Sequence, residues 1–181
     1  MRTAGATVNV VNSVTVKVTA KDAADSSSIT GARVYLEADT GGPLPAADVV
    51  TITRSGSTAT VSHTTHGLST GDLVKIRGAD QSEYNQKATI TVTGASSYTY
   101  TVSGTPATPA TGTITSTAVI LDDVTDGSGV VQDTGFAFAS NQPVTGRIRK
   151  NTSSPRFKTS PVSGTITTAG FDSTTFLVGD E

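Results

Sequence analysis

The chain has 181 residues, no cysteine and a formal net charge of -2 at pH 7. Its length allows one substantial domain or two small ones, and the lack of cysteine excludes disulfides, thiolate nucleophiles and cysteine zinc sites. The slight negative charge excludes a global attraction to nucleic acid or to an anionic membrane. No apolar run approaches the roughly 18 residues that span a bilayer, so we expect a soluble protein made in the cytoplasm.

Charged residues make up 15% of the chain, against a usual share of about 25%. Thr, Ser and Gly take their place, as expected where a surface consists of strands and turns. Hydrophobic residues still account for 35% of the chain, which is enough for a packed core once the glycines are added. We therefore predict a folded, all-β protein.

Two strands are predicted near the start of the chain. In residues 12–22, valines alternate with polar residues, which is the period-2 pattern of a half-buried strand. Residues 31–38, GARVYLEA, alternate in the same way. Residues 39–48 contain two glycines and two prolines, so we interpret them as a linker. Because a lone hairpin is marginal in water, we expect the two strands to pair with strands near the C-terminus.

Residues 49–117 contain six short apolar patterns separated by glycine-rich turns. Threonines occupy the outward positions, and no helical period is present. Short strands at this spacing are typical of a small antiparallel barrel or sandwich. We predict a small β domain here, inserted into a discontinuous sandwich.

Both histidines lie in residues 62–78, SHTTHGLSTGDLVKIRG. Positions i and i+3 of a strand lie on opposite faces, so His63 and His66 could bind one metal only if the chain bent sharply between them. A third ligand would also be needed, for which Asp72 and Glu83 are the candidates.

The alternative is a structural turn between two strands, and we favour it. His63 continues an inward-facing pattern and His66 precedes Gly67. Gly67 and Gly71 allow positive backbone angles, and the carboxylate of Asp72 can accept hydrogen bonds from backbone N–H groups across the loop. We therefore predict no metal site.

The strand patterns lengthen again in residues 118–150, where TDGSG predicts a tight hairpin turn. Two further strands are predicted at residues 165–168 and 174–178. The acids of DDVTDGSG do not match a calcium loop, because either register places a residue without a side-chain oxygen at a ligand position. No nucleophile elbow, phosphate-binding loop or zinc-protease motif occurs. We expect no catalytic residue, no cofactor and no enzymatic activity.

Residues 147–158, RIRKNTSSPRFK, hold five basic residues and no acid. If NTSSP is a turn, two arginines face outward on one strand and two basic residues lie on its neighbour. Three interpretations stay open: a solvated hairpin edge that discourages aggregation, a contact with an acidic patch on a neighbouring subunit, and, less favoured in an acidic protein, nucleic acid. The candidate interface residues are Arg147, Arg149, Lys150, Arg156 and Lys158.

Two sets of motifs carry resemblances to known families. TGARVYLEA and TDGSGVV resemble motifs of the transthyretin-like or carboxypeptidase-regulatory-like immunoglobulin sandwich. HGLSTGD, VKIRGAD, the pair Tyr84–Asn85 and YTYTVSGTPATPATGTI resemble a small β module of tailed-phage structural proteins. The resemblances imply an Ig-like antiparallel sandwich over residues 1–44 and 118–181, an inserted domain over 49–117, and a linker at 39–48.

The implied setting is a phage virion, reached after synthesis in the host cytoplasm. We expect a capsid decoration or cement protein that stabilises the head by contacts with the major capsid protein or other virion proteins. Its Thr-rich strands and N-terminal segment suggest strand exchange in a homo-oligomer, for example a trimer, with no membrane or nucleic acid partner. The alternative is a tail-fibre or baseplate module that recognises a host glycan, which the inward positions of Tyr98 and Tyr100 disfavour.

Overall fold

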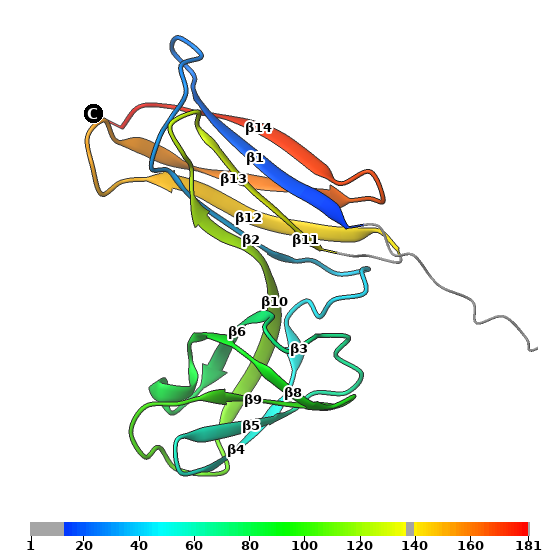
Figure 1. Ribbon diagram of the computed structural model, residues 1–181. Coiled ribbons are helices and arrows are strands. Elements are labelled where there is room, and N and C mark those ends of the chain that lie inside the picture. The colour runs from blue at the N-terminus through cyan, green and yellow to red at the C-terminus, as the bar shows by residue number, and fades with distance from the viewer. Residues whose placement is uncertain (1–12, 137–139, 181) are drawn as a thin grey trace, which may run out of the picture.

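The computed structural model describes residues 13–136 and 140–180, which form an all-β structure with two lobes (Figure 1). The sandwich lobe contains β1, β2 and β11 to β14, the small lobe contains β3 to β9, and β10 runs through both (Figure 1). Among these residues the one helical segment is the 3-10 turn η1 (Ser82–Tyr84). None of them forms a helix long and apolar enough to cross a membrane. The predicted all-β class is confirmed.

One sheet of the sandwich lobe is built around the first predicted strand. β1 (Val14–Asp22) lies between β11 (Val130–Phe136) and β14 (Phe171–Leu177). It is antiparallel to β11 and parallel to β14. The alternate valines of β1 are buried, as the sequence pattern predicts. The expected pairing with C-terminal strands is confirmed, with the addition that one of these pairs is parallel.

The second sheet is long and continues from the sandwich lobe into the small lobe. Its order is β13–β12–β2–β10–β6–β7, with β3 also paired to β10. The strands are β13 (Phe157–Ile166), β12 (Gln142–Lys150), β2 (Arg33–Ala38), β10 (Gly112–Val124), β6 (Leu73–Ala79), β7 (Lys87–Thr89) and β3 (Asp48–Val49).

β10 explains how one sheet serves both lobes. The first part of this 13-residue strand pairs with β6, and its last part pairs with β2. The division predicted between residues 117 and 118 therefore falls inside β10. The linker residues 39–48 are also attached to the fold, because the buried side chain of Gln142 accepts a hydrogen bond from the backbone N–H of Leu44 at 2.9 Å.

A third sheet completes the small lobe. Its order is β4 (Thr51–Ser55), β5 (Thr58–Ser62), β9 (Ser97–Thr101) and β8 (Thr91–Gly94). Tyr98 is fully buried and its hydroxyl lies 2.6 Å from Ser116 Oγ. Tyr100 is also buried and donates to the backbone carbonyl of Tyr84 at 3.1 Å. These two tyrosines belong to the core, as their position in the sequence predicts.

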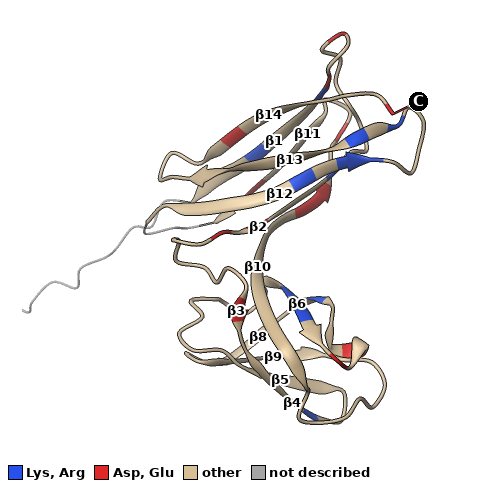
Figure 2. Cartoon of the chain, turned by 180° about the vertical axis from the view of Figure 1, so that it is seen from behind, with Lys and Arg blue, Asp and Glu red and all other residues tan. Residues whose placement is uncertain are grey.

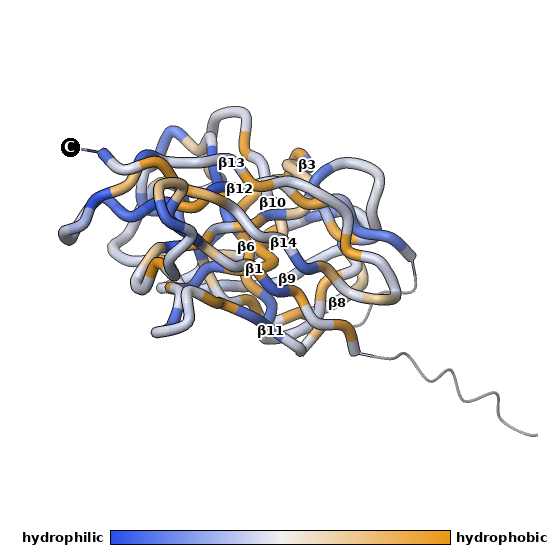
Figure 3. Tube along the Cα trace, turned by 90° about the horizontal axis from the view of Figure 1, so that it is seen from above, coloured by the Kyte–Doolittle hydropathy of each residue, from blue (hydrophilic) through white to orange (hydrophobic). Residues whose placement is uncertain are grey.

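Alternating side chains of the sheets supply the hydrophobic core. Figure 3 shows hydrophobic and hydrophilic segments following one another along the strands. The buried apolar residues of both lobes belong to one contiguous cluster. In β2, β6 and β12 the inward residues include Val34, Val74 and Ile148. Because successive side chains of a strand point to opposite faces, the residues between these positions face outward.

The hairpin predicted at TDGSG is wrong. The turn exists, since the backbone N–H of Gly129 donates to the carbonyl of Asp126 at 3.0 Å. However, the strands on either side, β10 and β11, belong to different sheets. Gly129 lies against β1, where its carbonyl accepts a hydrogen bond from Ala20 N at 2.8 Å. The turn therefore directs the chain across the sandwich, because β1 provides the pairing partner for β11.

Candidate basic site on the long sheet

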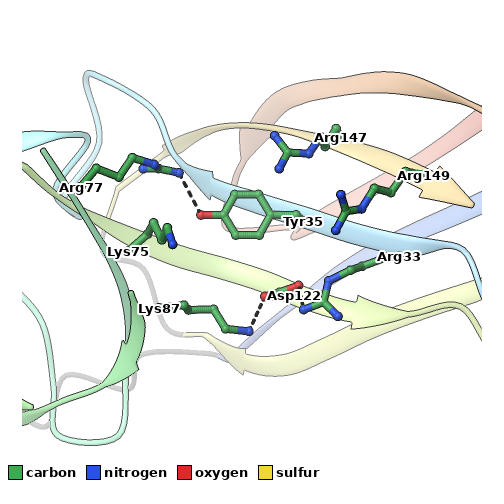
Figure 4. Close-up of a pocket in the computed structure, with 8 residues that line it drawn as sticks. All are labelled: Arg33, Tyr35, Lys75, Arg77, Lys87, Asp122, Arg147 and Arg149. Carbon is green, nitrogen blue, oxygen red and sulfur yellow. Dashed lines mark hydrogen bonds and ion pairs between the residues drawn. The ribbon is translucent and has the colours of Figure 1, made fainter. Parts of the chain in front are cut away.

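A pocket of about 300 Å³ lies on the outward face of the long sheet (Figure 4). Strands of both lobes contribute to it, and Figure 2 shows basic segments on β12 in one lobe and on β6 in the other. Tyr35 lies in the middle of the labelled side chains (Figure 4). The pocket is lined by Arg33, Tyr35, Lys75, Arg77, Lys87, Asp122, Arg147 and Arg149.

A buried ion pair fixes one side of the pocket. Asp122, on β10, has a side chain that is only 4% exposed. Arg33 Nη2 lies 2.6 Å from Asp122 Oδ1, and Lys87 Nζ forms an ion pair with Asp122 Oδ2. The contact between Arg33 and Oδ1 is an ion pair that lacks the geometry of a hydrogen bond. Arg33 comes from the sandwich lobe and Lys87 from β7 of the small lobe. Asp122 therefore connects the lobes through its two cationic partners.

A second network involves Tyr35 and Arg77. Arg77 Nη2 lies 2.6 Å from Glu37 Oε2, and the Tyr35 hydroxyl donates to the same oxygen at 2.6 Å. Burial, followed by the hydrogen bond and charge of Glu37, raises the pKa of Tyr35 above its ordinary value. Burial by itself would lower the pKa of Arg77, but Glu37 and Tyr35 together outweigh burial and raise that pKa. Both groups therefore keep their protons, and Arg77 stays cationic.

Like charges face each other across neighbouring strands at two places. Arg149 on β12 is directly opposite Arg33 on β2, and Lys75 on β6 is directly opposite Lys87 on β7. Such pairs destabilise a sheet unless another charge compensates. Asp122 compensates Arg33 and Lys87. Their partners Arg149 and Lys75 have no carboxylate partner among the described residues.

Arg147 completes the group of cations without a carboxylate. Its guanidinium carbon lies 5.7 Å from the centre of the Tyr35 ring, a cation–π contact that positions the side chain. Six basic residues line the pocket, against the carboxylates of Asp122 and the neighbouring Glu37. Guanidinium and ammonium groups held in this way bind oxyanions. The lining residues can hold and orient an anion, and they include no paired nucleophile and base.

The five residues predicted to form one interface do not all lie together in the structure. Arg147 and Arg149 are exposed and line the pocket. The Lys150 ammonium instead lies 5.9 Å from the centre of the Phe157 ring. Arg156 precedes β13 and Lys158 lies within it, and both are exposed outside the pocket.

Four basic residues of the pocket were missed by the sequence analysis. Arg33, Lys75, Arg77 and Lys87 are scattered over β2, β6 and β7. Their outward positions in alternating strands were visible in the sequence. The sequence does not show that β10 pairs with both β2 and β6, and this pairing brings the four basic residues together.

The histidine segment is a structural turn, as predicted. His63 and His66 are 2% and 3% exposed. The backbone N–H of Leu68 donates to His66 Nδ1 at 3.0 Å, and His66 Nε2 lies 3.0 Å from the carbonyl of Gly94. Because Nδ1 accepts from Leu68, Nε2 is the ring nitrogen that can donate to the carbonyl of Gly94. Asp72 Oδ2 accepts from Ser69 N at 2.8 Å.

His63 is buried in the same cluster. Its Nε2 lies 3.3 Å from Asp48 Oδ2, and its Nδ1 has no hydrogen-bond partner among the described residues. Burial lowers the pKa of His63, although Asp48 opposes the effect. Within residues 13–136 and 140–180, no three His, Asp or Glu residues are grouped in a way that could hold a metal ion.

No protein-family model and no curated protein matches the chain significantly. Among solved structures, the chain is similar to one described as phage phi92 endosialidase, with 15% identity and a TM-score of 0.34. The match covers 80% of this chain and 24% of that chain, so the chain spans about a quarter of the length of its structural neighbour. A likeness this weak does not assign a function.

Proposed function

We propose that the protein is a non-enzymatic structural component of a tailed-phage virion. In the most concrete form of the proposal, it is a capsid decoration protein that stabilises the head by contacts with the major capsid protein. The assignment to a phage particle rests on the resemblance of the sequence motifs to those of tailed-phage structural proteins. Binding to another protein is supported mainly by the basic pocket on the long sheet. There, Lys75, Arg147 and Arg149 lack a carboxylate partner among the described residues.

The position of these cations supports a contact with another protein. They stand on paired strands rather than on loops, so their backbone is already ordered and binding restricts mainly their side chains. A neighbouring acidic surface would offset the repulsion between like charges across the strands. Because Lys75 belongs to the small lobe and Arg147 to the sandwich lobe, a bound partner would contact both lobes.

The alternative, a tail-fibre or baseplate module that binds a host glycan, has less support. Glycan sites usually present exposed aromatic rings. Of the four tyrosines in the chain, Tyr84, Tyr98 and Tyr100 are buried in the small lobe. Tyr35 is half-buried beneath Arg147.

Two measurements test the proposal. Immunogold electron microscopy of intact particles should label the head. Gold confined to the tail would contradict the decoration role and favour the tail-fibre or baseplate alternative. Purified protein added to particles that lack it should rebind, and R147E/R149E should rebind less. The matched control R156E/K158E changes the same amount of charge outside the pocket. Equal rebinding by both double variants would remove the pocket from the mode of action.

A further inference from the structure

We propose that the pocket receives two carboxylates of one acidic protein segment, one bound by Arg147 and Arg149 and the other by Lys75. The identity of the partner as a virion protein rests on the proposed function. The chemistry of the site rests on the arrangement of the pocket alone. An assay with purified protein therefore tests this inference separately from particle binding.

The six cations of the pocket divide into two groups of three. Arg33 and Lys87 share the single carboxylate of Asp122, and Arg77 is paired with Glu37. These three form the frame of the pocket. The free cations, Lys75, Arg147 and Arg149, have no ion pair among the described residues, so they are the groups available to a ligand.

The separation of the free cations sets the number of carboxylates. Arg147 and Arg149 are alternate residues of β12, so their side chains leave the same face about 7 Å apart. Lys75 is on β6, and the strands β2 and β10 lie between β6 and β12. Three steps of about 4.8 Å separate the two strands by about 14 Å. Lys75 is also displaced along the strands, because it lies opposite Thr117 of β10, whereas Arg147 lies in the row of Tyr35 and Asp122. Two carboxylates on one segment match this separation better than one small anion does.

The chemistry of the three cations favours carboxylates of a protein over nucleic acid. A planar guanidinium binds a planar carboxylate through two parallel hydrogen bonds, and Tyr35 holds the guanidinium of Arg147 in place. Nucleic acid requires cations that follow a line of phosphates. Here the exposed cations Arg156 and Lys158 lie outside the pocket, and the acids Asp122 and Glu37 lie within or beside it.

The test is a calorimetric titration of the full-length protein at low salt. The probe is the end-capped peptide Gly-Glu-Gly-Ser-Glu-Gly, and the matched probe has Gln in place of both Glu residues. We expect the Glu peptide to bind with a stoichiometry of one. The Gln peptide and inorganic phosphate should bind at least about tenfold more weakly, because they lack paired carboxylates.

Two charge-matched variants locate the site. K75Q/R147Q should weaken binding of the Glu peptide at least about tenfold, while R156Q/K158Q should leave it unchanged. Circular dichroism spectra and thermal melting confirm that each variant folds. Equal losses in both variants, or equal binding of the Glu and Gln peptides, would overturn the proposal. Tighter binding of a single-stranded oligonucleotide than of the Glu peptide would overturn it in favour of nucleic acid.

If the Glu peptide binds in the pocket but the protein never binds to phage particles, only the proposed function fails. If the protein rebinds to particles and K75Q/R147Q rebinds normally, the acidic-segment inference fails while the virion role stands.

Discussion

The histidine turn and the basic pocket both bring nitrogen-bearing side chains together, but these side chains differ in burial and in their partners. His66 makes hydrogen bonds to the backbone through both ring nitrogens and is almost completely buried. In the pocket, Arg149 and Lys75 each face a like charge across a strand pair. A side chain that is buried and bonded to the backbone on both sides supports the fold, whereas cations that are accessible to solvent and lack a carboxylate partner among the described residues are available to a ligand. Changes in the turn should therefore affect stability, and changes to the free cations should affect binding.

The largest effect is expected for His66→Ala. The substitution removes a ring whose centre lies 5.4 Å from that of Tyr98, and it deprives Leu68 N of its acceptor. Lost packing and a buried unsatisfied donor together should cost about 3 kcal/mol of unfolding free energy. Urea denaturation measures this loss. Binding of the Glu peptide should not change in the folded fraction, and a change there would contradict the separation between turn and pocket.

Asp122→Asn should have the next largest effect. It leaves Arg33 and Lys87 beside each other without the carboxylate between them. Removal of one partner from a fully buried pair costs about 3–5 kcal/mol, but these two cations are 44% and 33% exposed. Water therefore reduces the expected loss to about 2 kcal/mol. The neighbouring exposed acid provides the control Asp123→Asn, whose midpoint in urea should hardly move.

The pH dependence of stability should come partly from His63. Burial lowers its folded-state pKa below the ordinary value, so the unfolded chain binds the proton more tightly. Stability from this group is present above about pH 6.5 and is lost as the pH falls toward the folded pKa, with a slope of at most about 1.4 kcal/mol per pH unit. Melting curves at pH 7 and pH 5 measure it. His63→Gln should reduce the difference between these curves, and an unchanged difference would assign it to other groups.

The fold was largely predictable because strands with one buried face alternate visibly, as in the valines of β1. Less predictable was the segment from Ala88 to Val92, whose alternating apolar residues are typical of one continuous strand. It divides at the buried Ile90 into β7 of the long sheet and β8 of the third sheet. Alternation identifies the inward face of a strand but does not specify which sheet it joins.

The difference between local pattern and strand pairing also explains why only part of the pocket was predictable. The run from Arg147 to Lys158 was visible as a local excess of charge, yet only Arg147 and Arg149 line the pocket. Lys75 and Arg33 join them through the pairing of β10 with two different strands. Non-local pairing of this kind depends on register and packing across the whole core, which no short stretch of sequence specifies.

The smallest predicted effect is the most specific test of the difference between paired and free cations. Arg149→Gln removes the like charge opposite Arg33 and breaks no ion pair among the described residues. It should therefore stabilise the fold by a few tenths of a kcal/mol, about the cost of facing like charges across a strand pair. Lys158→Gln removes an equal charge outside the pocket and should leave stability unchanged. Urea denaturation at low salt compares the variants, and the gain should shrink at about 1 M salt, where the screening length is about 3 Å. A loss of stability in Arg149→Gln would mean that this arginine supports the fold, and the pocket would then resemble the histidine turn.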